Sequence, residues 1–238
     1  LFQKRFLDKA AGIHAVSREE ISLISYYTAN KNIFFVPNGI NTKLKKIFEK
    51  KTVNKKINIG YLGRISDEKN ILGLIKSISL LDENILNKIK ILIMGPDKNR
   101  YANRCKNLVT KLNLGKKIFF EGSIDNEEKW SKLSKMDIYI QPSYSDGPPL
   151  TIIEAMICEL PIIATRTCNI SYLNGEPFLK MVEPIPRDIA RGITEALDDF
   201  KTFKKSGKNA YYYVVKNLDS KLVAEKLITA YRDTIKNN

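Results

Sequence analysis

The chain has 238 residues, of which 43% are hydrophobic and 28% charged, an ordinary balance for a globular protein. No apolar run approaches the roughly 20 residues needed to span a bilayer, and no signal-peptide pattern opens the chain. The three cysteines, Cys105, Cys158 and Cys168, have neither the spacing of a disulfide framework nor that of a zinc site, so we expect a reducing cytoplasm.

The net charge is +14, and seven lysines between Lys43 and Lys56 carry much of it. One interpretation of this cluster is a solvated linker. Another is a patch that holds the protein at the inner face of a membrane, because each basic residue near an anionic lipid surface contributes about 1 kcal/mol. No aromatic-interleaved basic stripe or nucleic-acid-binding motif accompanies the lysines, so we expect no nucleic acid as a partner.

The first 42 residues contain short elements only. The patterns predict a helix over 1–11, a strand over 12–17, a helix over 18–27 and a strand over 33–36. These elements are too few to close a sheet of their own.

From Ile57 onwards, short apolar runs alternate with amphipathic segments. We expect strands at 57–62, 89–94, 117–120, 138–141, 161–164 and 178–182, and helices at 68–81, 101–112, 129–135, 150–158, 187–200, 201–215 and 220–236. Strands separated by helices of this length predict an α/β fold with a Rossmann-like parallel sheet and helices on both faces. Such sheets bind ligands at the carboxyl ends of their strands.

Four of the predicted strands are followed by a loop that contains glycine, namely Gly63, Gly95, Gly122 and Gly147. Glycine suits a backbone that turns sharply or lets a ligand approach. The loop after the first strand of the sheet also carries two cations, Arg64 and Lys69. These loops therefore predict one binding site at one edge of the sheet.

The segment from Ser143 to Met156 passes from a strand into a helix through a Gly-Pro-Pro turn. The free backbone N–H groups and the positive dipole end of such a helix favour a phosphate group. Asp146 and Glu154 lie eight positions apart and bracket that turn. Carboxylates repel phosphate, so hydroxyl groups of a sugar or a ribose are their better partners.

This segment resembles the signature S-x-x-E-G-x-P-L-x-x-x-E-A-M of glycosyltransferase family 4, also called glycosyl transferases group 1. Gly63-Arg64-Ile65 followed by Glu68-Lys69-Asn70 resembles a second signature of that family. The resemblance implies the carboxy-terminal, donor-binding half of a two-domain GT-B fold. Residues 1–42 would then be the remnant of an amino-terminal acceptor domain and linker, 43–218 the nucleotide-sugar domain, and 219–238 a terminal helix that packs back toward the amino-terminal domain.

The resemblance further implies a retaining glycosyltransferase that needs neither metal nor cofactor. It would move a hexose-type sugar from a nucleoside-diphosphate-sugar, such as a UDP- or GDP-sugar, to a glycan or lipid-linked acceptor in bacterial polysaccharide or lipopolysaccharide biosynthesis. The catalytic residues implied are Arg64 and Lys69, which would stabilise the leaving diphosphate, and Asp146, which would position the sugar. The donor-binding residues implied are Gly63, Gly95, Gly122, Ser123, Ile124, Gly147, Leu150, Thr151 and Glu154, with Glu154 holding the ribose.

Three positions depart from the family pattern. Asp146 replaces a glutamate and is shorter by one methylene group, Glu159 replaces a helix-ending glycine, and Thr167-Cys168-Asn169 replaces a loop usually rich in glycine. If the backbone at Glu159 is left-handed, that replacement costs on the order of 1 kcal/mol. These departures leave a second function open, a sugar-nucleotide-binding module without transfer activity.

Overall fold

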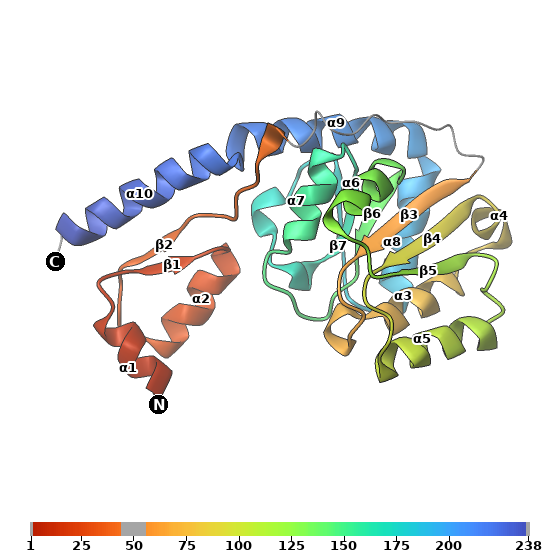
Figure 1. Cartoon of the computed structure of the whole chain (residues 1–238), viewed down its shortest axis with the longest axis horizontal. Helices are drawn as coiled ribbons and strands as arrows, with labels where there is room; N and C mark the ends of the chain where they lie inside the picture. The colour runs from red at the N-terminus through yellow and green to blue at the C-terminus, as the bar shows by residue number, and fades with distance from the viewer. Residues whose placement is uncertain (1, 44–55, 237–238) are drawn as a thin grey trace.

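The computed structural model describes residues 2–43 and 56–236. Within the basic cluster, Lys45 to Lys55 therefore lie outside the described residues. The centre of the molecule is a six-stranded, fully parallel sheet (Figure 1), which confirms the predicted fold class. Its strands are β3 (Ile57–Leu62), β4 (Ile89–Met94), β5 (Ile118–Gly122), β6 (Ile138–Gln141), β7 (Ile162–Thr165) and β8 (Leu179–Val182).

The strand order in the sheet is β5-β4-β3-β6-β7-β8. The chain therefore starts in the middle, builds outward through β4 and β5, and then returns to the other side of β3 to add β6, β7 and β8. The connections on the two sides leave β3 and β6 in opposite directions, which opens a crevice at the carboxyl ends of these two strands. This position in the fold is where a ligand site is expected.

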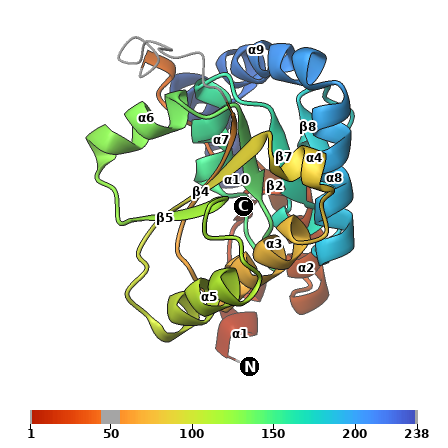
Figure 2. The same ribbon diagram turned by 90° about the vertical axis from the view of Figure 1, so that its right-hand side faces the viewer.

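Helices cover both faces of the sheet (Figure 2). One core lies under α3 (Ile71–Ile78), α5 (Arg100–Lys111) and α8 (Pro186–Asp198), and the short α4 (Glu83–Leu86) packs at its margin. A second core lies under α6 (Asn126–Ser134), α7 (Leu150–Ile157) and α9 (Phe200–Asn217). Because both faces are buried, the strands are apolar on both sides, as in Ile138-Tyr139-Ile140, where every side chain is buried.

The start of α3 differs from the sequence expectation, whereas the end of α7 agrees with it, and a left-handed residue shapes the backbone at both places. The helix expected from residue 68 begins only at Ile71, because Asp67–Lys69 form a 3-10 turn and Asn70 adopts a left-handed conformation with φ 54°. At the other end of the site, α7 is closed by Glu159, also left-handed with φ 58°. The N–H groups of Glu159 and Leu160 donate to the carbonyl oxygens of Met156 and Ala155, the two bonds of a Schellman motif.

A smaller unit lies beside the sheet and joins the two ends of the chain (Figure 1). It consists of α1 (Phe2–Lys9), β1 (Ile13–Ala15), α2 (Arg18–Tyr27), β2 (Ile33–Phe35) and the last helix, α10 (Ser220–Lys236). Strands β1 and β2 pair in parallel, and α10 runs past β2, where the rings of Phe34 and Tyr231 meet edge to face at 5.8 Å. None of the helices in the described residues is long and apolar enough to cross a membrane.

The two segments that connect the small unit with the sheet lie side by side. Ile40 and Asp219 form an isolated parallel bridge, in which Ile40 N–H donates to Leu218 O and Ser220 N–H donates to Ile40 O, both at 2.9 Å. Two further contacts join the units near the predicted site. Asn38 Nδ2 donates to Pro148 O at 3.4 Å, and Ser171 N–H donates to Glu19 Oε1 at 3.1 Å.

Candidate functional site

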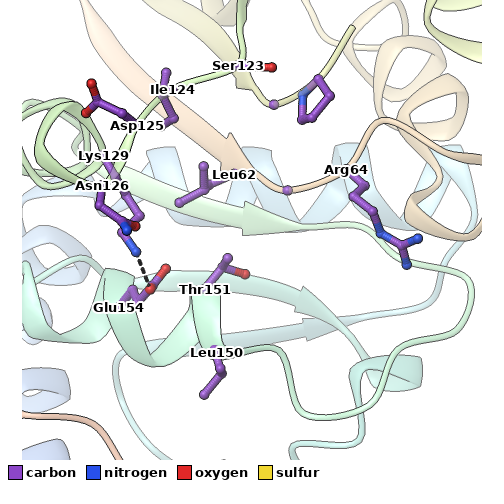
Figure 3. Close-up of a pocket in the computed structure, with 13 residues that line it drawn as sticks. Leu62, Arg64, Ser123, Ile124, Asp125, Asn126, Lys129, Leu150, Thr151 and Glu154 are labelled. Atoms are coloured by element: carbon purple, nitrogen blue, oxygen red, sulfur yellow. Dashed lines mark hydrogen bonds and ion pairs between the residues drawn. The ribbon is translucent and has the colours of Figure 1, made fainter. Parts of the chain in front are cut away.

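A cavity of about 350 Å³ opens at the carboxyl ends of β3, β4 and β5 and faces the start of α7 (Figure 3). It lies at the crevice that the strand order creates. It is lined by residues from β3, from the loops after β3, β4 and β5, and from α6 and α7, namely Leu62, Gly63, Arg64, Gly95, Pro96, Ser123, Ile124, Asp125, Asn126, Lys129, Leu150, Thr151 and Glu154. Eight of these lining residues were predicted from the sequence as site residues: Gly63, Arg64, Gly95, Ser123, Ile124, Leu150, Thr151 and Glu154.

Of the first three loop glycines, Gly63 and Gly95 line this cavity, whereas Gly122, which was also predicted as a site residue, lies outside the lining. Gly63 N–H donates to Met94 O at 3.0 Å, and Gly95 N–H donates to Gly122 O at 2.8 Å. The backbone pairing of β3 with β4 and of β4 with β5 therefore continues to the first residue after β3 and after β4. A Cβ atom on Gly95 would lie 1.9 Å from the carbonyl oxygen of Gly63. The close approach of the two strand ends therefore requires glycine at residue 95.

The start of α7 forms the opposite wall. Its N-cap is Pro149, which makes no side-chain capping bond, so the first turn relies on other acceptors for its N–H groups. Leu150 and Thr151 from this turn both line the cavity. Gly147 lies just outside the lining, and a Cβ atom on it would meet nothing within 4 Å. Gly147, in the turn that leads into α7, is therefore exposed.

Arg64 lines the cavity from the loop after β3, and in Figure 3 it lies at the end opposite Lys129 and Glu154 with its guanidinium directed away from them. Its side chain is 75% exposed, and the guanidinium lies 3.6 Å from the carboxylate of Glu68, which is itself 64% exposed. Such an exposed ion pair is weak. The guanidinium group is therefore able to move toward an anion bound between the β3 loop and α7.

Lys69 and Asp146 do not line the cavity but meet beside it. The Lys69 ammonium nitrogen lies 2.5 Å from Asp146 Oδ2, and both side chains are 13% exposed. The same oxygen accepts hydrogen bonds from Gln141 Nε2 at 3.2 Å and Ser143 Oγ at 3.1 Å. Asp146 Oδ2 thus accepts from three donors, one in the loop after β3 and two in β6 and the turn that follows it.

Buried Asn70 fixes the loop that carries Lys69. Its Oδ1 accepts the N–H of Gly73, while its Nδ2 donates to Pro142 O at 2.9 Å and Pro184 O at 3.1 Å. The side chain is fully buried, and its left-handed backbone turns Lys69 back toward β6. Asn70 therefore ties the loop after β3 to the loop after β6, the two loops that bring Lys69 and Asp146 together.

The loop at 165–169 holds Asp146 through its backbone. Asp146 N–H donates to Thr167 O at 3.1 Å, and Asn169 Nδ2 donates to Asp146 O at 2.9 Å. Cys168 lies buried in this loop, and burial raises the pKa of its thiol to about 11, so the group stays protonated at neutral pH. The residues that replace the family's glycines thus form an ordered support for the Asp146 turn.

Sequence reasoning missed the residues that α6 contributes to the cavity. This helix was expected from residue 129, but it begins at Asn126, with Asp125 as an N-cap that accepts from the N–H groups of Glu127 and Glu128. Asp125, Asn126 and Lys129 all line the cavity. The Asp-x-x-Glu spacing from Asp125 to Glu128 is a start signal that would have placed the helix correctly. No group of three or more metal-ligating side chains occurs among the described residues.

Comparison with known proteins agrees with this geometry. Residues 42–213 match the family described as glycosyl transferases group 1. An uncharacterized glycosyltransferase of Methanocaldococcus jannaschii is 26% identical over 228 residues, covering 92% of this chain and 57% of the relative. The capsular polysaccharide biosynthesis glycosyltransferase CapM of Staphylococcus aureus is 24% identical over 209 residues, covering 83% of this chain and 51% of the relative. The chain thus spans about half the length of these curated relatives.

Solved structures share the fold. Sucrose-phosphate synthase from Thermosynechococcus elongatus superposes with a TM-score of 0.84 at 24% identity, over 99% of this chain and 61% of that one. HepE from Anabaena, solved in complex with UDP and glucose, gives a TM-score of 0.79 at 16% identity, over 94% of this chain and 63% of that one. These neighbours agree with the expected GT-B type of α/β fold. Because the family match extends over most of the sheet and its helices, the chain belongs to the glycosyl transferases group 1 family.

Proposed function

We propose that this protein is a retaining, metal-independent glycosyltransferase of family 4, and that the chain described here forms its carboxy-terminal, donor-binding half. It would transfer a hexose-type sugar from a nucleoside-diphosphate-sugar to a glycan or lipid-linked acceptor. The polysaccharide biosynthesis role of the relative CapM supports an acceptor of this class. The three cysteines are buried and remain thiols, which supports the cytoplasm as the compartment.

One observation carries the proposal. Arg64 and the first turn of α7 line the same cavity, so an exposed cation and a helix N-terminus without a side-chain cap both border one volume of about 350 Å³. A diphosphate bound there would receive backbone N–H groups from one side and a guanidinium from the other. As the glycosidic bond breaks, these groups would stabilise the charge that develops on the leaving diphosphate.

The other residues of the site would each bind a different part of the nucleotide-sugar donor. The cavity walls at Gly95, Ser123 and Ile124 would hold the nucleobase, and Glu154 would accept from the ribose. Lys69 would approach the diphosphate from beside the α7 turn, on the same side as Asp146. Asp146 would position the sugar, provided that donor binding draws Lys69 away from it. Among the described residues, Lys43 and Lys56 mark the ends of the cluster that would contact the membrane.

The test is release of nucleoside diphosphate by the full-length protein supplied with a panel of nucleotide-sugars and acceptors. Arg64→Ala is expected to lower turnover by at least tenfold, and Lys69→Ala by more, because each removes a cation from the leaving group. Arg104→Ala is the matched control, since Arg104 is 59% exposed on neighbouring α5 and pairs only loosely with Asp67 at 3.7 Å. Equal turnover by Arg64→Ala and Arg104→Ala would refute the proposed role.

A second candidate function is a nucleotide-sugar-binding module without transfer activity. The observation that favours it is the environment of Asp146, whose Oδ2 already has three donors and does not line the cavity. A module of this kind would bind nucleotide-sugars, and Glu154→Gln would weaken that binding. It would release no nucleoside diphosphate with any donor and acceptor tested, which separates it from the enzyme.

A further inference from the structure

The end of the cavity opposite Arg64 contains an ion pair between two helices. Lys129 from α6 and Glu154 from α7 both line the cavity, and Lys129 Nζ lies 2.7 Å from Glu154 Oε1 (Figure 3). Their side chains are 18% and 14% exposed, so the pair is largely shielded from water. Ion pairs in such surroundings keep a fixed geometry better than exposed ones do.

The pair leaves one acceptor and several donors available to a ligand. Glu154 Oε1 accepts from Lys129, whereas Glu154 Oε2 accepts no hydrogen bond from the described residues. Oε2 is also not fully buried, unlike Glu19 Oε2 and Ser66 Oγ, the two fully buried side-chain oxygens without a partner in the described part of the chain. The Lys129 ammonium has three N–H donors, of which one points to Glu154, and it also lies 4.9 Å from the ring centre of Trp130. An acceptor and a donor thus stand side by side in the cavity wall.

This arrangement complements two adjacent hydroxyl groups. In a vicinal diol, one hydroxyl can donate to a carboxylate oxygen while its neighbour accepts from an ammonium N–H. If only one of the two hydroxyls is present, the ligand forms fewer hydrogen bonds with the pair, because one oxygen with a single O–H has to serve both partners from one position. A site built to bind a hydroxyl discriminates strongly against the analogue that lacks it, because a shielded polar group is then left unpaired.

We propose that Lys129 is a specificity-determining residue that acts together with Glu154 to bind both hydroxyls of the ribose, and so restricts the ligand to ribonucleoside diphosphates over their 2′-deoxy counterparts. The proposal rests on the nucleotide-sugar function proposed above and names the class of donor more narrowly. It assigns Lys129 a direct donor role toward the ligand, in addition to neutralising Glu154.

The experiment measures binding of UDP, GDP and ADP, and of the matching 2′-deoxy and 3′-deoxy diphosphates, by titration calorimetry. For the diphosphate that binds the unaltered chain best, removal of either ribose hydroxyl is expected to weaken binding by about tenfold to a hundredfold. Lys129→Met is expected to weaken the ribonucleotide by about tenfold and to reduce its preference over the deoxy forms to about threefold or less.

The chain offers a matched control one turn further along α6. Lys132 forms a similar ion pair with Glu121 at 2.6 Å, but neither residue lines the cavity. Lys132→Met is therefore expected to keep the unaltered affinity and the unaltered preference for ribose. Lys129→Arg, which retains a cationic donor, is expected to restore part of the preference that Lys129→Met loses.

The outcomes separate the two proposals. If none of the diphosphates binds the unaltered chain, the nucleotide-sugar function fails and this inference fails with it. If the unaltered chain binds a ribonucleotide but Lys129→Met keeps the full preference over the deoxy forms, only the role of Lys129 is refuted. If Lys129→Met does not fold, as judged by its thermal melting, Lys129→Gln and Lys129→Arg are compared in the same titration, and equal preference in both would refute the role.

Discussion

The ammonium nitrogen of Lys69 lies 2.5 Å from Oδ2 of Asp146, although the two residues are 77 positions apart and come from loops after different strands. The contact depends on the return of the chain from β5 to the other side of β3, which places the β3 and β6 loops next to each other. Removal of either group would leave the other largely shielded from water and without its partner of opposite charge.

Asp146→Asn and Lys69→Met are each expected to lower the free energy of unfolding by about 2 to 4 kcal/mol, because each leaves one charge without its partner. The double variant Lys69→Met/Asp146→Asn should be destabilised by less than the sum of the two. Urea denaturation of all four forms measures the coupling. The exposed pair Arg64 and Glu68 serves as the control cycle, with an expected coupling below about 0.5 kcal/mol. Strict additivity at Lys69 and Asp146 would contradict the prediction.

Asn70→Ala is expected to lower the free energy of unfolding by about 3 kcal/mol or more. The change removes three hydrogen bonds of a buried side chain and places alanine in a left-handed conformation. Asn113→Ala isolates the second effect, since Asn113 is also left-handed, with φ 55°, but exposed. That control should cost about 1 kcal/mol. Similar losses for the two variants in chemical denaturation would show that the hydrogen bonds of Asn70 contribute little.

Gly95→Ala and Gly147→Ala are expected to behave oppositely. The new Cβ atom at residue 95 would lie 1.9 Å from Gly63 O, and the backbone there has φ 151°, so we expect a loss of several kcal/mol in the free energy of unfolding. At residue 147 the new methyl group would meet nothing within 4 Å, so the melting temperature should stay within about 2 °C. A large loss of stability in Gly147→Ala would indicate that the turn before α7 is packed more tightly than the structure indicates.

Glu159→Gly is expected to stabilise the protein. Glu159 occupies the left-handed position of the Schellman motif that ends α7, where glycine avoids a steric cost of about 1 to 2 kcal/mol but loses some of that gain through its greater freedom in the unfolded chain. We expect a net gain of about 0.5 to 1 kcal/mol, measured by urea denaturation. Asn113→Gly is the comparison, and its gain should be smaller because asparagine tolerates this conformation better.

Stability is expected to fall below about pH 4. Hydrogen bonds from Lys106 to Asp97, from Arg191 to Asp188 and from Thr42 to Asp219 hold the pKa of each carboxyl below its ordinary value. The pKa of each carboxyl is lower in the folded state than in the unfolded state. Each carboxylate therefore stabilises the fold fully above its unfolded pKa, and this stabilisation is lost as the pH falls through its folded pKa. Asp188→Asn should therefore flatten the dependence of unfolding free energy on pH between about 2 and 4. An unchanged slope would exclude Asp188 from the effect.

Most of the sheet could be predicted from sequence, because each strand is an apolar run bounded by a glycine or a polar turn. The four strand ends with glycine also indicated the edge where the cavity lies. What sequence could not supply was the pairing of side chains from separate elements. Lys129 and Glu154 are 25 positions apart on two helices, and only the packing of both helices on one face of the sheet brings them together.

The orientation of Asp146 was a second limit. Its position in the signature implied a contact with sugar hydroxyls, and that role stays a prediction. The structure shows the carboxylate among Lys69, Gln141 and Ser143. Gln141 and Ser143 lie in the strand end and turn that precede Asp146, so their side chains reach it only through the local bend of the backbone. Residue type and spacing do not determine such a bend.

Two segments connect the small unit with the sheet, one after β2 and one before α10, and they are hydrogen-bonded to each other at the bridge between Ile40 and Asp219. Any rotation of β1, β2 and α10 against the sheet therefore has its pivot at that bridge. Asn38 lies two residues from the pivot and touches Pro148, at the entry to α7. Through this contact, a rotation of the small unit would shift the turn that precedes the α7 N-terminus, so a movement far from the cavity would change the wall that α7 contributes to it.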